Sequence, residues 1–215
     1  MKTIKRAAIT AVCILCFCVP WAQADILSVG GSYTYPVYLL HNGSPLTDGG
    51  GSVDPSYLNG QLLAYLYCVD PWTVVYPNRT YNNTVVTTTG VINGAPVNNA
   101  GQIAWLLTHY GTGGQGGNAY ALQAAIWHVV DPTLTIDPNR ASANQVTLYN
   151  SYLAALGNNT GNVSAFLWIS PAVSSSNTKY QGLVAPGTQT PIPAAIWLLA
   201  SGLIGVIGIR RKFAK

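Results

Sequence analysis

The segment from Ala119 to Asp131 constrains the fold most strongly, because it has the pattern of a buried helix with one polar residue on its apolar side. The apolar residues that recur at helical spacing are Ala119, Leu122, Ile126, Val129 and Val130. Asn118 is a suitable N-cap, and Asp131 precedes a proline, which disfavours helical backbone at that residue. Gln123 lies within the apolar stripe, one turn before Trp127. A glutamine in a core needs partners for its amide group, so we expect the rest of the fold to supply them.

The first 24 residues have the pattern of a secretory signal peptide. Lys2, Lys5 and Arg6 precede an apolar run from residue 7 to 22, and Ala22-Gln-Ala24 is a small-x-small cleavage site. We therefore expect the mature chain to start at Asp25 and to be exported.

Removal of the signal peptide changes the number of cysteines in the mature chain. Three of the four lie in the leader, so the mature chain keeps only Cys68. A single thiol forms no internal disulfide, and a free thiol is a liability in an oxidising compartment. Cys68 is therefore either a buried, unreactive residue or a residue committed to other chemistry.

The charge pattern of the body, residues 25–190, argues against nucleic-acid binding. Six aspartates and no glutamate stand against three cations, which are Arg79, Arg140 and Lys179. Nucleic-acid binding needs clustered Lys and Arg to displace counterions. Two aspartate pairs lie in expected loops, Asp48 with Asp54 and Asp131 with Asp137, but they lack calcium-loop spacing. We expect neither a metal nor a cofactor.

The C-terminal segment has the features of a membrane helix. No residue from Ile192 to Ile209 is charged, and Arg210-Arg-Lys follows directly, which fits a single span held at its cytoplasmic end. The opening Pro191-Ile-Pro-Ala-Ala-Ile-Trp-Leu, the centre Ser201-Gly-Leu-Ile-Gly and the basic end resemble the proline-containing variant of the PEP-CTERM sorting signal. The resemblance implies that an exosortase cuts near the prolines and releases the protein to the cell surface or extracellular matrix of a Gram-negative bacterium.

The pattern of the body predicts an α+β fold, with a mainly antiparallel β body, sandwich or barrel-like, and an inserted lobe of about three helices. Strands are expected at 33–40, 61–70, 80–89, 163–170 and 180–185, with a Gly/Ser/Asp loop at 42–51. Helices are expected at 96–110, at 118–131 and from Asp137-Pro138 to Gly157. The expected domains are a signal peptide at 1–24, one folded domain at 25–185, a linker at 186–190 and the sorting signal at 191–215.

Three segments of the body resemble the thioester domains of bacterial surface adhesins. They are Tyr67-Cys68-Val69-Asp70, Ile103-Ala-Trp-Leu-Leu-Thr-His109 and Leu122-Gln-Ala-Ala-Ile-Trp-His128. The resemblance implies a covalent bond between the Cys68 sulfur and the Gln123 side-chain carbonyl, made with loss of ammonia. It also implies covalent capture of an amine- or hydroxyl-bearing surface polymer or protein. The adhesin stalk and Gram-positive wall anchor have no counterpart here, which favours attachment in a biofilm matrix over adhesion to host cells.

Four residues are candidates for assisting or shielding this bond. Asp70, His109 and His128 are candidates for proton transfer, since Asp70 shares a strand face with Cys68 and the histidines lie on the two adjoining helices. Asp70 is equally suited to an Asx turn before Pro71, and each histidine to a structural role. Trp127 is a candidate shield against water or a plain core residue.

Two other functions stay open. The first is a secreted cysteine hydrolase that uses Cys68 with His109 or His128, although a cysteine in mid-strand beside Asp70 lacks the cation or helix N-terminus that lowers a thiol pKa. The second is a non-reactive structural matrix protein in which Cys68 and Gln123 are core residues.

Overall fold

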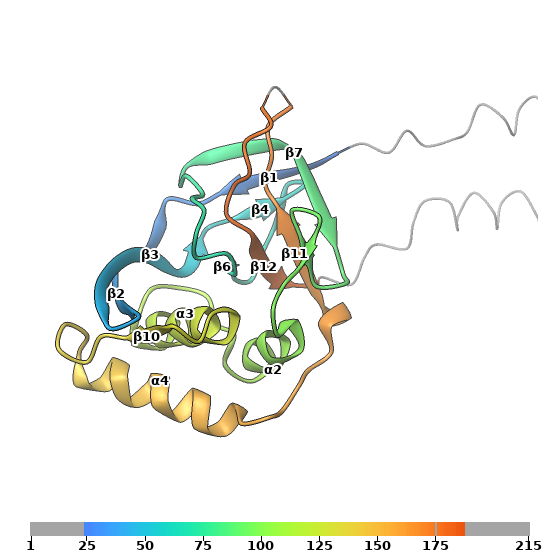
Figure 1. Ribbon diagram of the computed structural model, residues 1–215. Helices are drawn as coiled ribbons and strands as arrows, with labels where there is room; N and C mark the ends of the chain where they lie inside the picture. The colour runs from blue at the N-terminus through green and yellow to red at the C-terminus, as the bar shows by residue number, and fades with distance from the viewer. Residues whose placement is uncertain (1–23, 175, 188–215) are drawn as a thin grey trace, which may run out of the picture.

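The computed structural model describes residues 24–174 and 176–187 and shows strands packed on three helices (Figure 1). The expected signal peptide, up to residue 23, and the expected sorting signal at 191–215 lie outside these residues, as does most of the expected linker. Within the described part of the chain, no helix is both long enough and apolar enough to span a bilayer.

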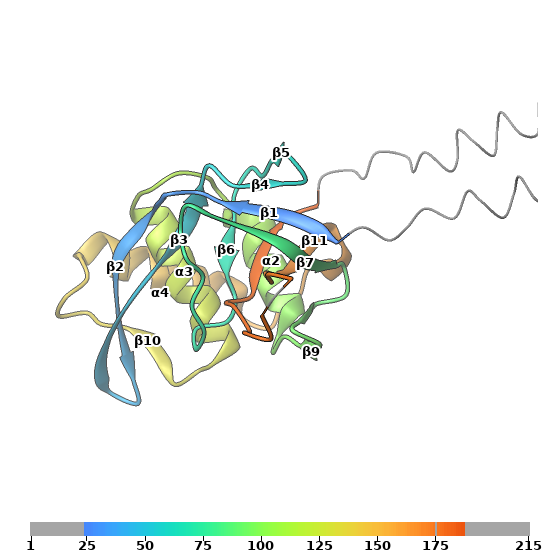
Figure 2. The same ribbon diagram turned by 90° about the horizontal axis from the view of Figure 1, so that it is seen from above.

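The largest sheet has seven strands, and every pairing in it is antiparallel. Its order is β5 (Gln61–Leu62), β4 (Tyr57–Leu58), β1 (Asp25–Val29), β7 (Arg79–Thr87), β11 (Phe166–Ser170), β12 (Leu183–Pro186) and β6 (Tyr67–Cys68). A second sheet joins β10 (Leu134–Ile136), β2 (Ser32–His41) and β3 (Ser44–Asp54), and β8 (Val91–Ile92) pairs with β9 (Ala95–Pro96). The seven-stranded sheet and the curved β2–β3 ribbon form the β body (Figure 2).

The helices α2 (Ala100–Tyr110), α3 (Gly117–Val130) and α4 (Ala143–Leu156) are inserted between β9 and β11. In Figure 1, α3 lies between the strands and α4, with α2 beside it. This arrangement confirms the predicted α+β fold with a mainly antiparallel body and an inserted helical lobe.

Three hairpins turn at Asn-Gly pairs, and one of them corrects the sequence prediction. Asn42-Gly43, Asn59-Gly60 and Asn93-Gly94 all have positive φ at both residues, as a two-residue turn between antiparallel strands requires. The turn at Asn42-Gly43 leads straight into β3, so the loop expected at 42–51 is wrong. Gly49, Gly50 and Gly51 lie within β3, which pairs with β2.

Other element bounds also differ from the prediction. The run 61–70 is not one strand, because β5 and β6 each hold two residues and belong to opposite ends of the large sheet. The last helix begins at Ala143 rather than at Asp137, because Ser142 and Gln145 form a capping box. Gly116 rather than Asn118 is the N-cap of α3, and it makes no side-chain capping bond.

Candidate functional site

Gln123 lies in the middle of α3 and its side chain is fully buried. The spacing predicts a one-sided amphipathic helix, but every residue of α3 from Ala119 to Trp127 is buried, because strands cover one side and α2 and α4 the other. Both polar atoms of the Gln123 amide bond to one residue. The backbone N–H of Cys68 donates to Oε1 over 3.0 Å, and Nε2 donates to the carbonyl oxygen of Cys68 over 2.7 Å. The fold thus satisfies the amide and fixes it against the Cys68 backbone.

Side chains from segments distant in the sequence fix the position of α3. Before the helix, the Gln115 amide donates to the carbonyl oxygen of Ser52 over 2.7 Å and accepts from the Thr34 hydroxyl over 2.9 Å. In the last turn of the helix, the carbonyl oxygen of Val129 accepts a bond from the Asn99 amide over 2.8 Å, and it is one of the carbonyls that a helix end leaves unpaired. These bonds join α3 to β2, β3 and the start of α2, so the position of Gln123 is set by the body as a whole.

Cys68 ends the short strand β6, opposite Leu183 of β12, and is buried. Burial raises the pKa of its thiol far above the ordinary value, and the negative charges of Asp48 and Asp70 raise it further. The thiol is therefore protonated at neutral pH, and it becomes a nucleophile only when a neighbouring group accepts its proton.

Gly50 brings the backbone of β3 directly onto Gln123. A Cβ atom at this position would lie 2.4 Å from Gln123 Cγ and 3.0 Å from the Trp127 ring. Only a residue without a side chain allows this approach. The β3 backbone therefore covers one side of the glutamine, where it excludes water.

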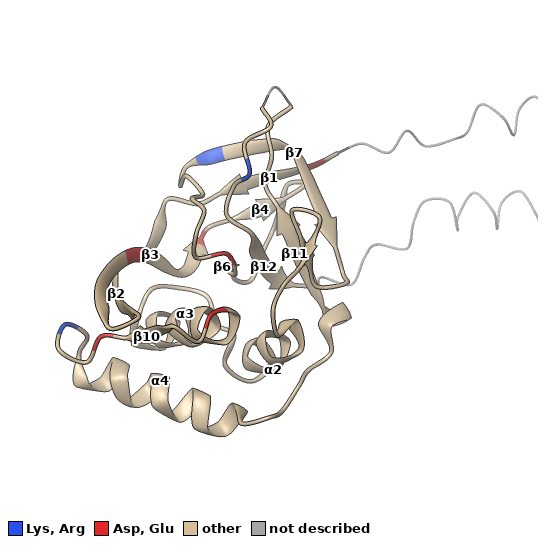
Figure 3. Cartoon of the chain, in the orientation of Figure 1, with Lys and Arg blue, Asp and Glu red and all other residues tan. Residues whose placement is uncertain are grey.

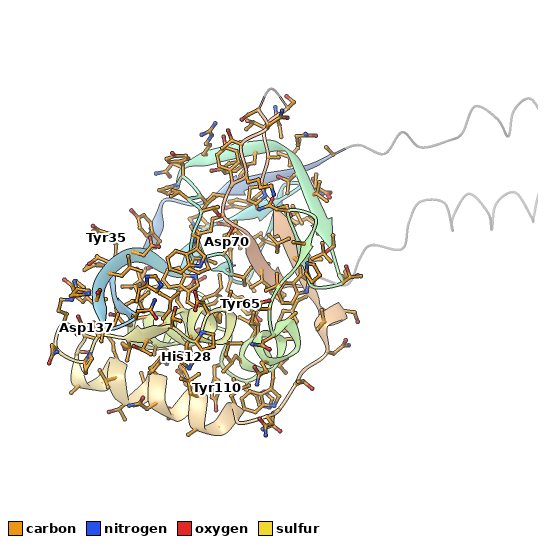
Figure 4. The ribbon with its side chains drawn as sticks, in the orientation of Figure 1. Tyr35, Tyr65, Asp70, Tyr110, His128 and Asp137 are labelled. Carbon is orange, nitrogen blue, oxygen red and sulfur yellow. The ribbon has the colours of Figure 1, made fainter. Side chains whose placement is uncertain are left out.

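A cavity of about 290 Å³ reaches Cys68 from the surface. Three tyrosines line it and are exposed, namely Tyr33, Tyr35 and Tyr76, and Figure 4 shows Tyr35 beside the β2–β3 ribbon. Because exposed side chains and a buried cysteine line the same cavity, a partner group in solution has a route to Cys68. Asp48 and Gln181 complete its polar lining together with Thr73.

Asp70 belongs to a turn and does not line this cavity. Its carboxylate accepts bonds from the backbone N–H of Trp72 over 3.1 Å and from the hydroxyl of Thr73 over 2.5 Å. This is the Asx turn that the position before Pro71 also suggested. Asp70 is absent from the described residues that line the cavity at Cys68, although its charge acts on the Cys68 thiol.

The two histidines bond to backbone carbonyls away from Cys68. His109 is exposed, its Nδ1 lies 2.8 Å from the carbonyl oxygen of Trp105, and its ring stacks on that indole. His128, which Figure 4 labels, has its Nδ1 2.7 Å from the carbonyl oxygen of Leu134. Its ring meets that of Tyr149 of α4 edge-on. A carbonyl accepts, so Nδ1 is the donor in both rings. Of the described residues that line the cavity at Cys68, none is a histidine.

Trp127 is fully buried one turn after Gln123, and its ring lies against Gly50. Its indole nitrogen has no hydrogen-bond partner among the described residues. The ring packs beside the glutamine in the core and does not line the cavity. If Trp127 shields Gln123 from water, it does so on the side that faces the core, whereas Gly50 covers the side that faces β3.

Sequence reasoning missed Asp48 and Gly50, because both lie in the segment expected to be a loop. Asp48 is half-buried on β3, it accepts a bond from the backbone N–H of Gly49 over 2.7 Å, and burial raises the pKa of its carboxyl. The signal that finds them is Asn42-Gly43, which predicts a hairpin and so a second strand through residues 44–54. Within residues 24–174 and 176–187, no cluster of three His, Cys, Asp or Glu side chains is placed to bind a metal ion.

The fold and site define an α+β domain in which a helix glutamine is fixed against a strand cysteine. Residues 65–162 match the family model described as the thioester domain, and this segment includes Cys68, Asp70, His109, Gln123, Trp127 and His128. The match supports a thioester domain in this part of the chain. No curated protein and no solved structure matched the chain.

Proposed function

We propose that the Cys68 sulfur and the Gln123 side-chain carbon form an internal thioester, which captures amine- or hydroxyl-bearing partners covalently. The observation that carries the proposal is the two-bond contact between the Gln123 amide and the Cys68 backbone, with both residues buried. The family match over residues 65–162 supports it independently.

The chemistry of formation follows from this contact. The Cys68 sulfur attacks the Gln123 amide carbon, the C–N bond breaks, and ammonia leaves with the thiol proton. The Cys68 N–H, which lies 3.0 Å from Oε1, is placed to stabilise the negative charge that develops on this oxygen. The held geometry and the exclusion of water by β3 offset the unfavourable exchange of an amide for a thioester.

In capture, the Gln123 acyl group is transferred from the Cys68 sulfur to a new nucleophile. An amine or hydroxyl group enters through the cavity and attacks the same carbon. The new C–N or C–O bond forms, the C–S bond breaks, and the Cys68 thiol is released. One partner is bound per chain, and no turnover follows, so the protein acts as a single-use binding module rather than as an enzyme.

The bond is tested by intact-mass measurement of protein produced from the full chain. We expect a mass lower than the sequence mass by one ammonia, and one linked peptide pair that holds Cys68 and Gln123. The variants Gln123→Ala and Cys68→Ala should both show no such deficit. After treatment with methylamine, the amine should be attached at Gln123 and one thiol should become titratable. A full mass in the untreated protein, with a free thiol, would refute the proposal.

The hydrolase alternative has less support from the site. Neither His109 nor His128 lines the cavity at Cys68, and the Cys68 thiol pKa is raised rather than lowered. The matrix-protein alternative predicts an intact Gln123 amide, and the mass measurement therefore separates it from the thioester.

We further propose that the protein works outside the cell. The support is the sequence alone, namely the signal-peptide pattern at 1–24 and the resemblance of 191–215 to the PEP-CTERM sorting signal. In this proposal an exosortase releases the chain from a transient membrane anchor. The captured partner is then a polymer or protein of the cell surface or biofilm matrix.

A further inference from the structure

The cavity at Cys68 contains one carboxyl group among its described residues, and this is Asp48. The bond from the Gly49 N–H fixes one carboxylate oxygen at 2.7 Å, while no hydrogen bond is seen to the other oxygen within the described residues. Burial raises the pKa of Asp48, so the carboxylate is a stronger base than an exposed one. Ionisable groups whose pKa is shifted by burial are common in functional sites.

We propose that Asp48 is the proton acceptor and donor of the Cys68–Gln123 site, both when the bond forms and when a partner opens it. This inference rests on the proposed thioester. It assigns the proton transfers to a residue that neither the sequence motifs nor the matched segment includes, because residues 65–162 begin after β3.

During formation, Asp48 accepts the Cys68 thiol proton while the sulfur bonds to the Gln123 amide carbon. The carboxylic acid then returns this proton to the amide nitrogen as the C–N bond breaks, and ammonia leaves. The buried thiol does not ionise by itself at neutral pH, so this step needs a base inside the cavity.

During capture, Asp48 accepts a proton from the amine that attacks the thioester carbon. It then returns the proton to the Cys68 sulfur as the C–S bond breaks. The carboxylate ends in its starting state in both directions, and no other reactant is required.

The remaining acid–base candidates are less well placed. Asp70 already accepts from Trp72 and Thr73 in its turn, and both histidines bond to carbonyls outside the cavity. Asp48 lies on β3 and lines the same cavity as Cys68 of β6. Figure 3 shows the acidic segments of β3 and of the turn after β6.

The test compares the full chain with the variants Asp48→Asn and Asp131→Asn. Asparagine keeps the acceptor for the Gly49 N–H but takes up no proton, and Asp131→Asn removes the same charge from a residue outside this cavity. We expect Asp131→Asn to form the bond and capture methylamine as the unchanged chain does. If Asp48→Asn folds but does not form the bond, it should have the full sequence mass without the ammonia deficit. If it does form the bond, it should capture methylamine about 100-fold more slowly, the lower end of the usual contribution of a positioned base.

Stability and pH dependence separate this role from a structural one. Because the folded state raises the Asp48 pKa above 3.8, the ionised carboxyl lowers stability as the pH rises above that value, and Asp48→Asn should unfold at the same or a higher temperature at neutral pH. The ratio of wild-type to Asp48→Asn capture rates should fall as the pH is lowered, because the protonated carboxyl accepts no proton.

A second carboxyl group, that of Asp70, lies outside the cavity, but its charge also acts on the Cys68 thiol. The pH profile is therefore measured for Asp70→Asn as well as for the unchanged chain. The titratable residues that line the cavity with Asp48 are Tyr33, Tyr35, Tyr76 and Cys68. Arg140 donates to the hydroxyl of Thr47, the residue before Asp48, over 3.0 Å.

The outcomes distinguish the two proposals. A wild-type chain of full mass overturns both the thioester and the role of Asp48. A wild-type chain light by one ammonia, with Asp48→Asn equally light and equally fast, overturns the role of Asp48 alone. Should Asp48→Asn fail to fold, the pH profiles of the wild type and of Asp70→Asn decide. A break at the same pH with methylamine and hydroxylamine that persists in Asp70→Asn supports the role of Asp48, and its absence from either protein overturns that role.

Discussion

At the scale of single residues, the site depends on close approach between backbone and side chain. The Gln123 amide bonds to the Cys68 backbone at both polar atoms, and the β3 backbone at Gly50 lies against the same side chain. The glutamine was predictable, because a polar residue in an apolar helical stripe stands out. Gly50 and Asp48 were missed, because a glycine-rich segment is ambiguous between a loop and a strand that passes close to another element, and the hairpin signal at Asn42-Gly43 was not used.

We expect Gly50→Ala to disrupt the site. The added methyl group overlaps Gln123 Cγ at 2.4 Å, so the amide must move off the Cys68 backbone. The ammonia deficit in the intact mass should disappear, and the free energy of unfolding should fall by about 1–3 kcal/mol, the usual effect of overpacking.

Gly116→Ala is the matched control for Gly50→Ala. A Cβ at Gly116 has no atom within 4 Å, and its φ of 170° is open to any residue. This variant should keep the mass deficit and lose no more than about 1 kcal/mol of stability, because Gly116 is the N-cap of α3 and alanine is a poorer N-cap than glycine. An unaltered mass deficit in Gly50→Ala would show that β3 does not constrain the glutamine.

At the scale of elements, the helices were more predictable than the strands. The three helices have long periodic patterns, and only their starts were misplaced, because the capping residues Gly116 and Ser142 compete with equally suitable neighbours. The short strands β5 and β6 have no period of their own, and their pairing with distant strands decides their place. Cys68 therefore lies in a strand, β6, but this strand is much shorter than the predicted strand at 61–70.

The proposed bond joins β6 to α3, two elements whose linked residues are 55 positions apart. By analogy with disulfides, closing a loop of this length stabilises the fold by roughly 4 kcal/mol. We expect methylamine, which opens the bond, to lower the free energy of unfolding by about this amount in urea titrations. Cys68→Ala should be folded, similarly destabilised and insensitive to methylamine. If Cys68→Ala does not fold, Cys68 acts mainly as a core residue.

At the scale of the whole molecule, the described body contains the proposed thioester site, whereas the sequence patterns at the two ends concern export and processing. The body carries the site, and β1 begins at Asp25, the residue expected to follow the signal-peptide cleavage. Asp25 accepts from the Asn59 amide over 2.7 Å and pairs with Thr84 of β7. The first residue of the expected mature chain is thus part of the large sheet, directly after the expected cleavage position.

The last prediction concerns processing of the full chain. Because the leader and the basic-ended apolar segment resemble export and sorting signals, we expect mature protein that begins at Asp25 and ends within or close to 186–193. It should appear in the medium or on the cell surface, and mass spectrometry of cell fractions measures both ends. Replacing Arg210, Arg211 and Lys212 with Gln removes the cations that we propose to hold the cytoplasmic end, so the release should change while the ammonia deficit stays. Protein found only in inner-membrane fractions, with residues 191–215 still attached, would contradict release by an exosortase but leave the thioester proposal unaffected.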